Sequence, residues 1–245
     1  MLPDDKCRAI IYEEQFFSTT ATGDDTSMTF DKYFPIWDKL SDAEKETLNN
    51  SVSLIFLKKG EPLRRCGSEC LGLTLVRSGQ IRTYITSEDG REITLYRLLE
   101  RDMCLFSANC IMQNIQFDVL MAAEKDTWLW IIPPYVYKTL METSIHVANY
   151  TNQLRASHFS EAMWMIEQVM WKSFDKRLAA FLIEESGLED SYILKITHEK
   201  IADHLGSARE VVTRMLRHFQ ADGLVKLSRG TIEITDIDEL MYLSE

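Results

Sequence analysis

Residues 196–234, with the sequence ITHEKIADHLGSAREVVTRMLRHFQADGLVKLSRGTIEI, decide the fold of the C-terminal part of the chain. Their pattern predicts two short helices joined by a tight turn and followed by a small β-hairpin. Thr197 can cap the first helix, because its hydroxyl can accept a backbone N–H that the helix leaves unpaired. Gly206 favours the positive φ angle at which many helices end. This arrangement is typical of a winged helix-turn-helix, which binds double-stranded DNA.

The second helix of the pair has an apolar inner side and a charged outer side. Ser207 and Glu210 fit an S-x-x-E capping box, which predicts the start of the helix, and Gly223 predicts its end. The inner side holds Val212, Met215, Leu216 and Phe219. Beyond this helix, β-prone residues at 225–227 and 231–234 flank a Ser-Arg-Gly turn and predict the wing.

Side chains on the outer side of this helix can read the edges of bases. An arginine can donate two parallel hydrogen bonds to guanine, and a glutamate can accept one from cytosine. Arg209, Glu210 and Arg214 lie on the first turns of the helix, the part that enters the major groove. The alternative is a surface helix of mixed charge in which Glu210 serves only as a cap. Given the turn and the wing, we predict DNA contacts at Thr197, Ser207, Arg209, Glu210, Thr213, Arg214, Arg217 and Arg229.

Short motifs along the chain resemble one known family. The run REVVTR at 209–214 resembles the recognition helix R-E-T-V-x-R of the Crp/Fnr transcription regulators. Four segments upstream resemble further motifs of that family, in the same order. They are KGEPL at 59–63, VRSGQI at 76–81, EDGRE at 88–92 and SFDKRLA at 173–179. The resemblance extends from about Phe34 to Leu240. Val211 departs from it, because the family often has threonine there and a valine side chain cannot hydrogen-bond to a base.

The resemblance implies an α+β protein with an N-terminal β-roll (a double-stranded β-helix, jelly-roll-like), a long dimerisation helix and a C-terminal winged helix-turn-helix. It implies a homodimeric transcription regulator that binds a palindromic operator with TGTGA-type half-sites and contacts RNA polymerase. A two-fold symmetric reader places its recognition helices about 34 Å apart. We predict four parts: an N-terminal extension at 1–30, the β-roll at 31–143, the dimerisation helix at 144–171 and the DNA-binding domain at 172–245.

Local patterns agree with a β-roll. The run Ser-Asp-Ala-Glu at 41–44 is another capping box and predicts a helix near 41–50. Many short strands at regular spacing suggest a sandwich or a roll. Such stretches occur at 53–57, 73–76, 81–85, 93–96 and 127–132. Pro133 and Pro134 end this region and predict the start of a further helix.

The stretch from about Ser144 to Trp171 contains no proline or glycine and predicts one helix of about 40 Å. Alternating steps of four and three along it form a heptad seam, which normally faces a partner helix. The predicted dimer interface consists of Ile145, Ala148, Asn152, Arg155, Phe159, Ala162, Ile166 and Val169. The alternative is a helix that packs only on its own β-roll.

Charge and hydropathy restrict the function further. The chain of 245 residues has a formal net charge of −11, whereas DNA-binding proteins usually carry a basic patch. From Lys195 to Gly230, however, seven Lys and Arg residues outnumber four acids, so this segment carries +3. No apolar run approaches the ~20 residues that span a bilayer. The acidic start Met-Leu-Pro-Asp-Asp is unlike a basic signal peptide, so we expect a cytoplasmic protein without a membrane partner.

The β-roll of the Crp/Fnr family often binds a cyclic nucleotide through a Gly-Glu pair and a later Arg-Ser pair. The matching positions here resemble Leu105-Phe106 and Phe117-Asp118, which offer neither the glutamate nor the arginine. An anionic phosphate without a cation is poorly bound. We therefore expect cyclic AMP not to be the effector. The pocket is either filled by side chains or accepts an apolar or aromatic effector, with Leu105, Phe106, Phe117, Ala162 and Met163 as its candidate residues.

The remaining chemistry-bearing residues form no cofactor pattern. The spacing of Cys7, Cys66, Cys70, Cys104 and Cys110 fits neither an iron–sulfur nor a zinc motif, and no haem-attachment motif occurs. We expect no metal and no cofactor, with reduced thiols as one interpretation and a redox-sensing pair as the alternative. His198, His204 and His218 are expected to be surface or phosphate-contacting groups. No nucleophile and base can be paired, so we predict no enzyme; a regulatory or scaffold protein that does not bind DNA is the other alternative.

Overall fold

The computed structural model describes residues 29–63, 72–105 and 119–245. The chain separates into two compact units, one formed by residues 1–83 and 96–159 and the other by residues 84–95 and 160–245. Each unit has its own apolar core. Among the described helices, none combines the length and the apolar character needed to cross a membrane.

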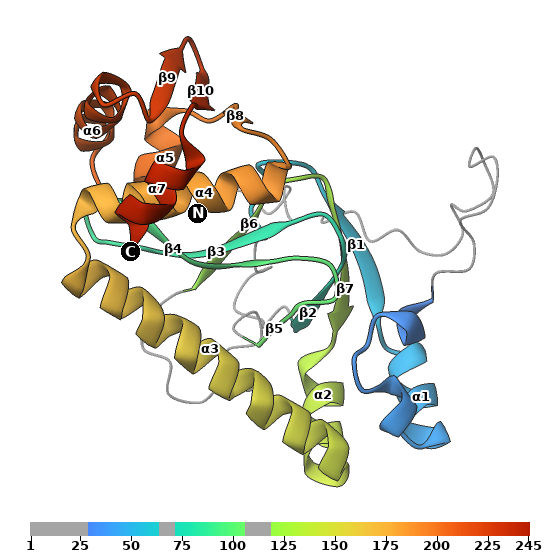
Figure 1. The fold of residues 1–245 in the computed structure, drawn as a ribbon. Helices are drawn as coiled ribbons and strands as arrows, with labels where there is room; N and C mark the ends of the chain where they lie inside the picture. Colours follow the sequence, from blue (N-terminus) through green and yellow to red (C-terminus); the bar gives the residue numbers. More distant parts are fainter. Residues whose placement is uncertain (1–28, 64–71, 106–118) are drawn as a thin grey trace, which may run out of the picture. The chain divides into compact units, whose positions relative to one another are not determined.

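A four-stranded antiparallel sheet runs through the first unit in the order β1-β7-β2-β5 (Figure 1). Its strands are β1 (Ser53–Leu57), β7 (Thr127–Ile132), β2 (Leu73–Ser78) and β5 (Met103–Cys104). Ser53 pairs with Ile131, and the register between β2 and β7 shifts once between Val76 and Ser78. The strands predicted at 53–57 and 127–132 are confirmed with the same bounds.

A second sheet has the order β4-β3-β6, with β3 (Ile81–Thr86), β4 (Glu92–Leu98) and β6 (Leu120–Ala123). Inward-facing side chains of both sheets form a buried cluster that includes Ile55, Val76 and Leu129. The β-roll that the resemblance implied is therefore present among the described residues.

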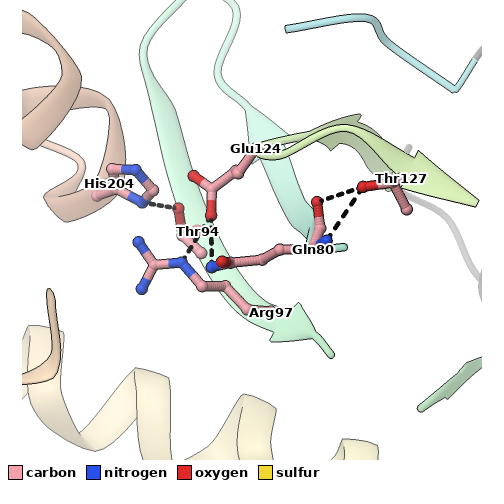
Figure 2. Close-up of polar contacts among 6 residues, drawn as sticks. All are labelled: Gln80, Thr94, Arg97, Glu124, Thr127 and His204. Carbon is pink, nitrogen blue, oxygen red and sulfur yellow. Dashed lines mark hydrogen bonds and ion pairs between the residues drawn. The ribbon is translucent and has the colours of Figure 1, made fainter. Parts of the chain in front are cut away.

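A cluster of polar side chains connects the β2–β3 turn to neighbouring strands (Figure 2). Glu124 Oε2 accepts from Arg97 Nε at 2.8 Å and from Gln80 Nε2 at 3.1 Å. The side chains of Arg97 and Glu124 are only 8% and 15% exposed. Gln80 N donates to Thr127 Oγ1 at 3.0 Å, and Thr127 Oγ1 donates to Gln80 O at 3.2 Å. A buried charge with a hydrogen-bonded partner can be retained at low cost, whereas removal of one partner would be expensive.

Helices pack beside the four-stranded sheet. Two 3-10 turns, η2 (Phe30–Lys32) and η3 (Trp37–Lys39), precede α1 (Asp42–Asn49), and the predicted capping box of Ser41 and Glu44 is confirmed. The helix predicted after Pro133 is α2 (Pro134–Thr143). The associated core contains Phe30, Phe34, Leu40, Leu48, Leu73, Leu75, Tyr137, Leu140 and Val147.

The long helix is α3 (Ile145–Trp171), as predicted from the absence of proline and glycine. Val147, Thr151 and His158 are buried along one side of it. The Thr151 hydroxyl lies 2.8 Å from the Tyr137 hydroxyl of α2, which ties the first turns of α3 to its own unit. One side of α3 therefore packs on its own unit, while other side chains remain exposed.

Residues 172–245 of the second unit form four helices and a three-stranded sheet. After α4 (Phe174–Glu189) come β8 (Ile193–Leu194), α5 (His198–Leu205), α6 (Arg209–Ala221), β9 (Val225–Ser228), β10 (Thr231–Ile234) and α7 (Ile237–Ser244) (Figure 1). The sheet order is β8-β10-β9. Helices α4, α5, α6 and α7 share one core with the sheet, around Leu178, Leu182, Ile201, Val212, Leu216, Phe219 and Leu240. This is the predicted winged helix-turn-helix.

Candidate nucleic-acid interface

Helix α6 is amphipathic, and its burial pattern determines which side chains can meet a ligand. Val212, Leu216 and Phe219 are buried in the core of the second unit, and Met215 is half-buried against it. On the other side, the charged residues Arg209, Glu210, Arg214 and Arg217 are all exposed. The predicted division into an inner and an outer side is confirmed.

The start of α6 differs from the prediction. The N-cap is Ala208 and no side chain caps the helix, so the capping box of Ser207 and Glu210 is wrong. The backbone explains the difference. Ser207 N donates to Ala202 O at 3.0 Å, so Ser207 completes the turn that ends α5 instead of starting α6. Glu210 thus has no capping role, and its carboxylate lies on the exposed side.

The turn between the helices forms as its sequence predicts. Thr197 caps α5 by accepting from Lys200 N at 3.2 Å. Gly206 follows with φ 63°, the left-handed conformation that glycine adopts at low cost. Arg177 of α4 donates from Nη1 to Leu205 O at 3.1 Å and so satisfies a carbonyl at the helix end.

The exposed sides of α5 and α6 are joined by side-chain contacts. Thr213 Oγ1 donates to Arg209 O at 2.9 Å, and His198 Nδ1 lies 2.9 Å from the same Oγ1. The Thr213 hydroxyl thus lies between the backbone of α6 and the ring of His198 at the start of α5.

The surroundings of His198 disfavour protonation of its ring. Burial and the nearby guanidinium groups of Arg209 and Arg217 lower the pKa of His198 below its usual 6.5. Glu199 stands next in the sequence, and its Oε2 lies 3.9 Å from Arg209 Nη1. Arg209 is thus the centre of a small charged group at the point where α5 and α6 begin.

A groove of about 430 Å³ separates these helix starts from the wing. It is lined by residues of α5, α6 and the β9–β10 hairpin, among them Thr197, His198, Glu199, Arg209, Gly230 and Thr231. Leu227 N donates to Gln220 Oε1 at 2.8 Å, which fastens the wing to the end of α6. Arg229 is exposed at the tip of the hairpin, where Gly230 has φ 75°.

The eight residues predicted to contact DNA all belong to this one unit. Thr197, Arg209 and Thr213 lie at the helix starts, Glu210, Arg214 and Arg217 extend along α6, Ser207 is in the turn and Arg229 is on the wing. Sequence reasoning missed Glu199, which contacts Arg209. It is the second residue of a predicted helix, and nothing in the local sequence indicates a contact with Arg209, which lies ten positions further on.

One histidine was placed wrongly. His204 was expected at the surface, but it is 4% exposed and its Nδ1 lies 2.8 Å from Thr94 Oγ1 (Figure 2). Its spacing could have indicated this, because His204 follows the buried Ile201 by three residues and so lies on the same side of α5. His198 and His218 are accessible, and His218 lies 2.7 Å from Asp222.

The predicted dimer seam lies largely on the exposed part of α3. Ile145 and Phe159 are each 66% exposed, Ile166 and Val169 are exposed as well, and Ala148 and Ala162 are half-buried. Asn152 and Arg155 are exposed between them. Large apolar side chains are normally withdrawn from water, so their accessibility on one helix is a feature to be explained.

The candidate effector residues are only partly described. Leu105 is buried in the core around Leu75 and Met103. Ala162 is half-buried and Met163 is exposed, both on the part of α3 that belongs to the second unit. Phe106 and Phe117 lie outside the described residues.

The described residues hold no group of three or more His, Cys, Asp or Glu side chains placed to bind a metal ion. The Cys104 thiol is buried, and Tyr96 Oη lies 3.5 Å from its Sγ. Cys7, Cys66, Cys70 and Cys110 lie outside the described residues, so the redox alternative stays a prediction.

Comparisons with known proteins agree with the two units. Residues 54–144 match the family described as cyclic nucleotide-binding domain, and residues 176–243 match the Crp-like helix-turn-helix domain. A solved structure from Eubacterium rectale, described as a regulator of the Crp/Fnr family, is 57% identical with a TM-score of 0.84. The match covers 87% of this chain and 99% of that one.

Two curated relatives are more distant. The transcriptional activator protein FnrA of Stutzerimonas stutzeri is 28% identical over 191 residues, which cover 74% of this chain and 75% of FnrA. The cyclic AMP receptor protein of Thermus thermophilus is 26% identical over 178 residues, which cover 73% and 82% of the two chains. Each match thus covers about three quarters of this chain.

Proposed function

Because the chain belongs to the Crp/Fnr family of transcription regulators, we propose that it acts as a homodimer that reads a palindromic DNA operator. In this proposal, the exposed side of α6 enters the major groove, and the wing and the start of α5 contact the phosphate backbone. The dimer would regulate transcription together with RNA polymerase. Neither the relatives nor the described residues give support to an enzyme or to a scaffold protein that does not bind DNA.

One observation carries the DNA-reading part of the proposal. Arg209, Glu210 and Arg214 are exposed on the same helix that buries Val212 and Leu216, so the side chains with base-reading chemistry project away from the core. Two arginines and one glutamate suit guanine and cytosine in an inverted repeat of TGTGA-type half-sites. Arg229 lies on the wing, outside α6, and suits a contact with a phosphate.

The experiment compares these two kinds of arginine. Arg209→Ala or Arg214→Ala should each cost about 1–3 kcal/mol of operator binding and relax the preference at one base pair. Arg229→Ala is the matched control, because loss of a phosphate contact should weaken binding equally on operator and unrelated DNA. Binding is measured by titration against operators with single base-pair changes. If Arg209→Ala and Arg214→Ala also leave every base preference intact, the reading role is wrong.

The dimer part rests on α3. Its seam residues are accessible while the opposite side of the helix is buried, so a second copy of α3 could cover Phe159, Ile166 and their neighbours. A dimer would present two recognition helices to the two halves of a palindrome. Half-site spacing of one helical turn, about 34 Å, is the expected operator geometry.

We further propose that the effector is not cyclic AMP. Leu105 and Phe106 resemble the positions of the family's Gly-Glu pair, and Leu105 is packed among Leu75, Met103 and Ile132. A ligand that binds only the folded protein raises the melting temperature. Cyclic AMP and cyclic GMP at about 1 mM should therefore give no shift here. The Thermus thermophilus receptor named for cyclic AMP serves as the positive control. A clear shift with this chain would overturn the proposal, and an apolar or aromatic effector would then lose its main support.

A further inference from the structure

The hairpin between β3 and β4 is structurally part of the DNA-reading unit. Residues 84–95 cluster with residues 160–245. Ile93 of β4 forms an antiparallel bridge with Leu205, the last residue of α5. The hairpin thus meets the helix-turn-helix at its turn.

The contact is close at the next residue as well. A Cβ placed on Gly206 would lie 3.0 Å from Ile93 Cδ1 and 3.3 Å from Ile93 Cβ. A larger residue at position 206 would therefore require the Ile93 side chain to move by a few tenths of an ångström. The glycine serves two purposes here: it adopts φ 63°, and it leaves room for the hairpin.

A buried hydrogen bond lies beside this contact. Thr94 Oγ1 is 2.8 Å from His204 Nδ1, and the two residues are 8% and 4% exposed (Figure 2). The imidazole ring of His204 also packs against Phe181 of α4, with ring centroids 5.2 Å apart. The side chain before the turn is thus held on one side by the hairpin and on the other by the core.

The turn in question sets the direction of α6. Gly206 N and Ser207 N both donate to Ala202 O, which closes the end of α5. Only Ala208 separates these residues from Arg209, the first residue of α6. A shift of the turn would therefore change the angle at which Arg209 and its neighbours meet DNA.

We propose that Ile93 and Thr94 are positioning residues for DNA recognition: the β3–β4 hairpin clamps the turn at Leu205 and Gly206 and fixes α6 in its reading orientation. The inference rests on the proposed function.

The main test is Thr94→Val in the full-length protein, which keeps the shape and removes the hydroxyl. Thr86→Val is the matched control, because Thr86 is exposed on the same hairpin. Hydrogen exchange at the amides of Gly206 and Ser207 should become about threefold to tenfold faster in Thr94→Val, as expected for loss of one buried hydrogen bond. Operator affinity should fall by a similar factor. Thr86→Val should change neither.

Unchanged exchange at both amides would overturn the clamp, and so would an increase in operator affinity, which would mean that the hairpin restrains binding. The exchange measurement needs no DNA. If the unaltered protein binds no DNA with sequence preference, the proposed function fails, while exchange in Thr94→Val still decides whether the hairpin holds the turn.

A second pair of variants tests the Ile93 contact. Gly206→Ala should weaken operator binding by distorting the turn, through both backbone strain and the close contact with Ile93. Ile93→Val removes the nearest atom, so the double variant Ile93→Val, Gly206→Ala should bind operator more tightly than Gly206→Ala alone. Equal losses in the two backgrounds would mean that Ile93 does not act on the turn.

Discussion

Glu199 Oε2 lies 3.9 Å from Arg209 Nη1, so a carboxylate of α5 accompanies the first arginine of the recognition helix. Both side chains are mainly exposed, and such a pair contributes little to stability. Its effect on binding is larger in principle. Arg209 must leave Glu199 to make two hydrogen bonds to guanine. The Glu199 carboxylate then lies near DNA phosphates, whose negative charge repels it.

Replacing Glu199 with Gln should therefore strengthen DNA binding. The free energy of an exposed ion pair is at most about 1 kcal/mol, so we expect a roughly twofold to fivefold gain in affinity. The gain should be larger for unrelated DNA than for the operator, since loss of a negative charge helps every phosphate contact. Titrations on both kinds of DNA at two salt concentrations measure this. Glu184→Gln, an equal charge change on α4, is the control, and the same gain in both variants would mean that only net charge matters.

The lowered pKa of His198 predicts a pH dependence of stability. Burial, Arg209 and Arg217 keep the pKa of the folded protein below 6.5, whereas the unfolded chain titrates near 6.5. The unfolded state therefore binds more protons as the pH falls through 6.5. The contribution of His198 to the free energy of unfolding is complete above that value and is lost toward the folded pKa.

Urea unfolding at about pH 7.5 and about pH 5.5 checks this linkage. His198→Gln should lose less stability between the two than the unaltered protein does. If His198→Gln keeps the pH dependence of the unaltered protein, other groups are responsible.

Local sequence determined much of the fold. The strands at 53–57 and 127–132 were predictable because apolar and aromatic residues give a clear pattern over five or six residues. The strands Met103–Cys104 and Ile193–Leu194 were missed, since two residues carry no period. Helix α7 was also missed, although Asp236 caps it by accepting from Glu239 N at 3.0 Å.

The errors at the site have a common cause. Ser207 was assigned to the start of α6 on local spacing, but its N–H closes the end of α5. His204 was assigned to the surface, but Thr94 reaches it from 110 positions away in the sequence. Local patterns identify which side of a helix is polar, whereas the partner of a buried polar group depends on distant chain segments.

Gly79, in the turn between β2 and β3, should be difficult to replace. It has φ 98°, and a Cβ there would lie 2.4 Å from Thr127 Oγ1 and 2.5 Å from Asp126 O. Gly79→Ala should cost at least about 2 kcal/mol, because conformational strain adds to a clash with backbone. Gly60 has φ 87° and open space around it, so Gly60→Ala should cost about 1 kcal/mol from strain alone. Denaturant midpoints measure the difference, and equal costs would refute the steric explanation.

The exposed seam of α3 gives the last prediction. Phe159→Asp should convert the homodimer to monomer, because the new carboxylate would be buried between two apolar helices. Operator affinity should fall with it, since a single recognition helix holds one half-site. Trp164→Asp is the control on the same helix: this tryptophan is exposed like Phe159 but lies outside the heptad seam. Sedimentation over a range of concentrations distinguishes the cases. A Phe159→Asp dimer together with a Trp164→Asp monomer would move the interface to the other exposed edge of α3.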